Sequence, residues 1–299
     1  MRIGFCASPV QPELSISSKS FKITLDRLGK LADWLNKLGI DFYRFPSKMF
    51  PTVKKEFVVK SDSGEKVVEK RVIDFSQVQS EVIVIGQLGK FYKSRGIRTC
   101  LHTSLYCNPV SLKEDVVKRS IDEIEILSYF LNKFGSGWLE TRLGPIGVSR
   151  ESAFSRFETF YESLSENTKS KLVIENDSMD VMFGSTQDLL DLNDMFGVKI
   201  VFDTGNFAVN PSEHRLEYVR VVEAFFERWK DGVPVFHYNN INPSDRDEID
   251  ADLFWGFCSA FYENDNDRDF DVMLTSKGRE FDVVSVKNFA VDNGIWEDD

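Results

Sequence analysis

The chain has 299 residues, 42% of them hydrophobic, which is enough apolar material for a large core. Its formal net charge of −11 argues against a surface that binds phosphates everywhere. The four cysteines form no CxxC pair, no apolar run reaches the ~18 residues of a membrane span, and the first residues do not resemble a signal peptide. We therefore expect a cytoplasmic protein with no membrane association.

The first half of the chain alternates between short apolar runs and longer segments whose apolar residues recur at helical spacing. Strands are predicted over residues 2–6, 41–45, 99–102 and 138–142, and helices over 18–38, 75–94, 111–134 and 149–165. Ser111 and Glu114 match the S-x-x-E capping pattern, which predicts a helix start at Ser111. Residues 53–71 contain two β-like runs around Ser-Asp-Ser-Gly, which predicts a charged hairpin inserted after the second strand.

The second half continues the same alternation. Strands are predicted to end at Glu175, Asp203, His237 and Leu274, and helices to cover residues 187–195, 216–229, 250–262 and 283–296. Strict alternation of strand and helix predicts a parallel sheet, and eight such units form a closed (β/α)8 barrel. We therefore expect one TIM-barrel domain over residues 1–299.

Polar side chains stand at the carboxyl ends of six expected strands, the edge where such barrels have their active sites. They are Arg44, His102, Arg142, Glu175, Asp203 and His237. Two acids and an imidazole at successive strand ends, with His102 as a possible fourth, form a ligand set for one divalent metal. Any one of the acids alone would as readily be an ordinary turn residue.

Seven segments of the chain resemble the UV damage endonuclease family and, more distantly, the apurinic endonuclease IV barrels. They are residues 39–51, 100–109, 115–131, 171–177, 200–206, 235–240 and 271–280, and include FYRFPSKMFP and LVIEND. The resemblance implies a cluster of divalent metals, typically manganese, at the top of the barrel, which cleaves DNA 5′ of a damaged nucleotide.

The resemblance also assigns roles to single residues of this chain. It implies that His102, Glu175, Asp203 and His237 are metal ligands, with Glu175 as the bridging carboxylate. It places Tyr106 near a residue that probes damaged bases, and Lys277 after the last strand as in the family.

Several family residues are replaced here. The replacements are Arg142 and Asn206 for histidines, Asp245 for a further histidine, Thr275 for a glutamate, Val235 for a modified lysine and Leu105 for the glutamine before Tyr106. With three histidines in the whole chain, we expect about one divalent ion, preferably manganese, instead of the full cluster. Arg142 would either clamp a phosphate in place of a metal, or pair with Glu175 and leave the barrel without a metal.

Three functions stay open at this point. The first is a divergent, metal-dependent endonuclease for damaged double-stranded DNA, with Glu175, Lys277 and Arg142 as catalytic residues and Tyr106, Arg44 and Arg279 at the DNA. The second is a single-metal sugar isomerase or epimerase, or a nucleotide-modifying enzyme, on the same barrel. The third is a non-catalytic descendant that binds DNA or protein. The acidic composition favours the last two, and the extent of the resemblance favours the first, which is our working hypothesis.

Overall fold

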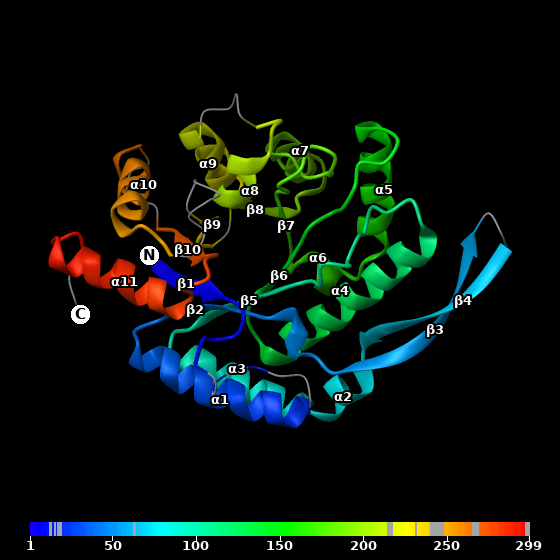
Figure 1. Ribbon diagram of the computed structural model, residues 1–299, viewed down its shortest axis with the longest axis horizontal. Helices are drawn as coiled ribbons and strands as arrows, with labels where there is room; N and C mark the ends of the chain where they lie inside the picture. The colour runs from blue at the N-terminus through cyan, green and yellow to red at the C-terminus, as the bar shows by residue number, and fades with distance from the viewer. Residues whose placement is uncertain are drawn as a thin grey trace.

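The computed structural model describes residues 1–11, 14, 16, 20–61, 64–213, 218–230, 232–239, 248–264 and 269–296. Asp245 lies outside these residues. Within them, eight parallel strands close into a barrel in the order β1-β10-β9-β8-β7-β6-β5-β2 (Figure 1). The strands are β1 (Arg2–Cys6), β2 (Phe42–Phe45), β5 (Arg98–His102), β6 (Trp138–Thr141), β7 (Leu172–Glu175), β8 (Lys199–Asp203), β9 (Val235–Tyr238) and β10 (Asp271–Leu274). The predicted (β/α)8 fold is confirmed.

Helices surround the barrel because each buries one apolar stripe against the strands. They are α1 (Phe21–Lys37), α2 (Phe75–Ser80), α3 (Val82–Ser94), α4 (Glu114–Phe134), α5 (Arg150–Ser163), α6 (Glu166–Lys169), α7 (Thr186–Phe196), α8 (Thr204–Val209), α9 (Tyr218–Glu227), α10 (Ala251–Asn264) and α11 (Glu280–Asp292). Aromatic rings fill much of the space between the two layers. Phe45 of β2, for example, packs edge-on against Tyr92 of α3 and Phe134 of α4, with ring centroids 5.6 and 5.4 Å away.

The hairpin expected after β2 is present, as β3 (Thr52–Ser61) paired antiparallel with β4 (Gly64–Ile73). It projects away from the barrel beside α2 and α4 (Figure 1). Among the described residues, no helix combines the length and the apolar character that crossing a membrane requires.

Some element boundaries differ from the prediction. Helix α4 begins at Glu114, because Lys113 takes the N-cap position and the Ser111 hydroxyl instead accepts a hydrogen bond from the Lys113 N–H at 3.2 Å. The capping pattern therefore belongs to the turn before the helix. The helix predicted over residues 75–94 is divided at Glu81 into α2 and α3. Strand β6 ends one residue before Arg142, and β9 ends one residue after His237.

Candidate functional site

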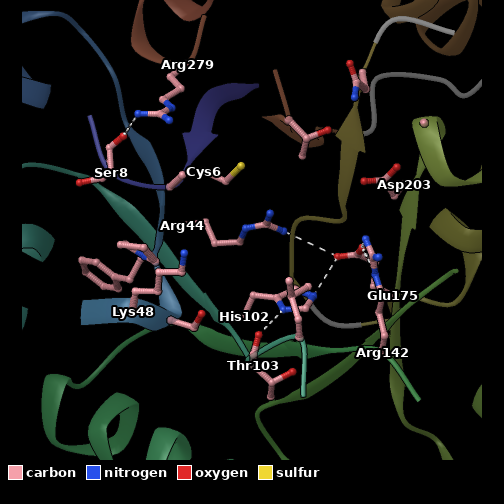
Figure 2. Close-up of a pocket in the computed structure, with 18 of the residues that line it drawn as sticks. Cys6, Ser8, Arg44, Lys48, His102, Thr103, Arg142, Glu175, Asp203 and Arg279 are labelled. Atoms are coloured by element: carbon pink, nitrogen blue, oxygen red, sulfur yellow. Dashed lines mark hydrogen bonds and ion pairs between the residues drawn. The ribbon is translucent and has the colours of Figure 1, made fainter. Parts of the chain in front are cut away.

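The polar strand ends meet at the carboxyl edge of the barrel, around a cavity of about 550 Å³ (Figure 2). Glu175 ends β7, Asp203 ends β8 and His102 ends β5, and the backbone register places Asp203 directly beside His237 of β9. Parallel strands of one barrel finish at the same end, so residues far apart in the chain become neighbours there. The cavity lies over this group, and its wall includes Arg44 and Arg142.

Glu175 is at the centre of the group. Its Oε2 atom lies 3.4 Å from His102 Nε2 and 3.4 Å from His237 Nδ1. His237 Nδ1 also lies 3.7 Å from Asp203 Oδ2. Glu175 Oε2 and His237 Nδ1 are both buried, and neither has a hydrogen-bond partner within the described part of the chain. Buried polar atoms left without a partner are costly, so this pair suits a bound ligand.

Each of the two imidazoles turns one ring nitrogen toward Glu175. The second ring nitrogen of each is engaged elsewhere, since His102 Nδ1 lies 2.7 Å from the Thr103 carbonyl and His237 Nε2 lies 3.2 Å from Glu140 Oε1. A ring nitrogen that donates to such an acceptor sets the tautomer, and the opposite nitrogen is then available to a metal.

Glu140 in β6 is a fully buried acid that the sequence analysis did not single out. Its Oε1 accepts a hydrogen bond from Trp138 Nε1 at 2.8 Å, and its Oε2 accepts one from Arg44 Nη1 at 3.1 Å. Single atoms of Glu140, Glu175 and His237 all lie within 4.8 Å of one another, so this cluster is compatible with a metal site. The signal in the sequence was an acid directly after the apolar pair Trp138–Leu139 of the expected strand, two residues before Arg142.

The two arginines are part of the same cluster. Arg142 donates to Glu175 Oε1 from Nε at 2.9 Å and from Nη2 at 2.5 Å. Of the two roles considered for Arg142, the structure shows the ion pair with Glu175. Arg44 Nη1, besides its bond to Glu140, lies 3.6 Å from Glu175 Oε2. Arg44 therefore faces the buried acids and also lines the cavity, and its contact with DNA stays a prediction.

These charges stabilise one another in a buried setting. Burial alone would raise the pKa of Glu140, but His237 and Arg44 beside it lower that pKa to about 2. Burial would likewise raise the pKa of Glu175, yet Arg142 and the two imidazoles hold it well below its usual range. Burial would lower the pKa of His237, and Glu140 together with the other carboxylates raises it well above the ordinary value. Both glutamates are therefore ionised near neutral pH.

Asn206 takes the position at which the resemblance expects a histidine. Its side-chain Nδ2 donates to Glu175 Oε1 at 3.0 Å and to the Asn176 carbonyl at 2.9 Å. Asp203 caps α8 by accepting the Asn206 backbone N–H on Oδ1 at 2.7 Å. The capping bond holds the Asp203 carboxylate so that its other oxygen, Oδ2, faces His237.

The remaining candidates lie around the cavity rather than at its base. Arg279 lines the cavity and donates from Nη1 to the Ser8 carbonyl at 2.6 Å. Lys277 is exposed on the loop after β10, outside the residues that line the cavity. Tyr106, on the loop after β5, is 85% exposed, so its side chain is not part of the core. The structure thus groups His102, Glu175, Asp203 and His237 and leaves Lys277 and Tyr106 apart from them.

A family model and the curated relatives point to one family. The family model described as UV-endonuclease UvdE matches residues 17–288. The UV DNA damage endonuclease of Clostridium perfringens (strain 13 / Type A) is 24% identical, over 96% of this chain and 70% of that protein. The UV-damage endonuclease of Schizosaccharomyces pombe is 29% identical, over 67% of this chain and 32% of that protein.

A solved structure confirms the fold. The crystal structure of SacUVDE superimposes with a TM-score of 0.79 at 22% identity, and the match covers 98% of this chain and 99% of that one. Because the family model spans most of the chain, the chain belongs to the UV-endonuclease UvdE family.

Proposed function

We propose that this protein incises damaged double-stranded DNA at the barrel mouth, with the help of a divalent metal. Its family and the names of its relatives, which are UV damage endonucleases, support a DNA substrate. The observation that carries the proposal is a pair of buried atoms below the open cavity, Glu175 Oε2 and His237 Nδ1, which lie 3.4 Å apart and have no hydrogen-bond partner among the described residues. The Arg142–Glu175 ion pair also fits a non-catalytic descendant without a metal, which the family and the names of the relatives do not favour.

In this proposal, Glu175, His237 and Asp203 hold the ion, and His102 is a fourth ligand. Glu140 belongs to the same cluster, and we assign it to orienting His237 rather than to the ion, because Trp138 and Arg44 donate hydrogen bonds to its two oxygens. A mixed carboxylate and imidazole set suits manganese better than magnesium.

The charges of the cluster support about one ion. The guanidinium groups of Arg44 and Arg142 pair with Glu140 and Glu175, and the third buried carboxylate, that of Asp203, lies beside His237. With both imidazoles neutral, as binding of a metal requires, the two arginines and three carboxylates carry a net charge of −1. Because the arginines already neutralise most of the acidic charge, a cluster of several divalent ions would leave a large positive excess in a buried space.

A bound divalent ion would lower the pKa of a water molecule and stabilise the negative charge of the leaving oxygen. The chain's own residues position the substrate. Arg142 lines the cavity, and its Nη1 makes no hydrogen bond within the described residues, so that N–H group is available to a phosphate oxygen. Lys48 and Arg279, which also line the cavity, add positive charge where the DNA backbone would arrive.

Incision of a defined substrate tests the proposal. Duplexes carrying a UV photoproduct or an abasic site, and the intact duplex of the same sequence, are incubated with the protein after chelation and again after addition of manganese. We expect cutting of a damaged duplex only with metal present, and little cutting of the intact duplex. If neither damaged duplex is cut with manganese, the proposal fails, and a non-catalytic descendant that binds DNA or protein replaces it.

A further inference from the structure

Exposed apolar side chains gather on one side of the barrel mouth. They stand on the loops that follow β5, β6 and β7, and beyond Leu105 and Tyr106 they are Leu112, Val148, Met179 and Val181. We call these four residues the apolar rim. Leu112, Val148 and Val181 are 64%, 81% and 62% exposed. Neighbouring exposed apolar residues on a protein surface commonly mark a site of interaction.

The loops that carry the apolar rim are tied to one another. The Ile146 N–H donates to the Val181 carbonyl at 3.0 Å, and Pro145 forms an isolated β-bridge with Met182. Leu112 lies against the loop that follows β6. A Cβ atom added to Gly147 of that loop would be 3.2 Å from Leu112 Cδ1.

A single arginine also joins two of the loops. Arg156 of α5 donates to the Val110 carbonyl at 2.7 Å and to the Ile146 carbonyl at 2.5 Å. These backbone contacts fix the loops, so the apolar side chains remain in solvent instead of folding back onto the protein.

The opposite side of the mouth has a different character. Lys48 follows β2, Ser8 follows β1 and Arg279 follows β10, and all three line the cavity. The mouth is therefore polar and basic on the side of β10, β1 and β2. On the side of β5, β6 and β7 its outer edge is apolar, with Arg142 deeper in the cavity. Asp180, exposed between Met179 and Val181, would repel a phosphate from the apolar side.

We propose that the apolar rim packs against the bases of a DNA duplex where the lesion has opened their stack. The basic side then receives the sugar–phosphate backbone. This inference rests on the proposed function. Base faces are the apolar part of DNA, and apolar side chains that enter a base step unstack it and kink the duplex. Unstacking costs a few kcal/mol and least at a damaged site, so apolar contacts here would favour damaged over intact DNA.

The test replaces Val148 and Val181, two residues of the apolar rim whose side chains are mostly exposed. Val148→Ser/Val181→Ser removes apolar surface without disturbing the core, and Val148→Leu/Val181→Leu keeps the surface apolar. The matched control is Ile83→Ser/Leu253→Ser. Ile83 on α3 is 73% exposed and Leu253 on α10 is 62% exposed, and both helices lie on the outside of the barrel. The substrate is a duplex with one abasic site flanked by 2-aminopurine, whose fluorescence rises when it unstacks.

We expect the serine variant to lose on the order of tenfold in kcat/KM on the damaged duplex, as partial burial of two valines would imply. It should also lose the fluorescence rise, while its affinity for intact duplex stays within about twofold. The leucine variant and the control should behave as the unaltered protein. If the unaltered protein incises DNA and the serine variant matches it in both readouts, the inference is wrong and the proposed function stands.

Two other outcomes would also overturn the inference. If the unaltered protein neither binds nor cuts the duplex, the inference and the proposed function both fail. If the serine variant instead changes the oligomeric state in size-exclusion chromatography, the apolar rim is a contact between copies of this chain. Thermal melting of each variant by circular dichroism shows that it is folded.

Discussion

Replacing Glu175 by Gln removes the negative charge at the centre of the cluster while keeping nearly the same shape. Under the proposed mechanism, the variant loses a metal ligand and the carboxylate that faces both imidazoles. A loss of about 4 kcal/mol of transition-state stabilisation would lower the incision rate by ~10³-fold. Binding of damaged duplex should be nearly unchanged, because the basic residues that line the cavity remain.

The same change should lower the stability of the fold. Glu175 is 1% exposed and accepts hydrogen bonds from Arg142 and Asn206. Removing one partner of a buried ion pair costs about 3–5 kcal/mol. We expect the lower end, about 3 kcal/mol, because Gln keeps one acceptor oxygen and the Arg142 side chain, 35% exposed, regains some water. At about 2–4 °C per kcal/mol, Tm should fall by roughly 6–12 °C.

The assays are single-turnover incision with manganese, duplex binding by fluorescence anisotropy, and thermal denaturation. Glu158→Gln, an exposed position on α5, is the matched control and should change none of them. The double variant Arg142→Gln/Glu175→Gln should lose less stability than the two single variants added together, since neither partner is then left buried and unpaired. Incision at the unaltered rate by Glu175→Gln would refute the assignment of this cluster as the active site.

Three further predictions concern the ion, the DNA and the core. Elemental mass spectrometry of protein grown with manganese should find about one divalent ion per chain, and three tightly bound ions would contradict the charge argument. Tyr106→Ala should leave Tm unchanged, because the side chain is 85% exposed, and should lower the ratio of incision on damaged to intact duplex; an unchanged ratio would exclude Tyr106 from lesion recognition. Phe45→Ala should cost about 3–5 kcal/mol in urea denaturation, and a loss below about 1 kcal/mol would mean that the β2 layer is loosely packed.

The sequence by itself determined the barrel and the strand ends. Each parallel strand is buried on both faces, so it appears in the sequence as a short apolar run. Each helix appears as a longer segment whose apolar residues recur at helical spacing. An acid that stops such a run stands out, which is how Glu175 and Asp203 were found. These patterns are local, so they place the boundaries of an element only to within a few residues. Helix α4, for example, was predicted to start at Ser111 and begins at Glu114.

Only the tertiary structure decides which residues of the cluster contact one another. Glu140 contacts His237 across 97 residues of chain, and Arg44 reaches Glu140 across 96, so no spacing in the sequence signals either contact. Whether a strand-end arginine faces a phosphate or a carboxylate depends on which strands become neighbours when the barrel closes. The apolar rim has the same origin, because three loops become one surface only where parallel strands finish at a common edge.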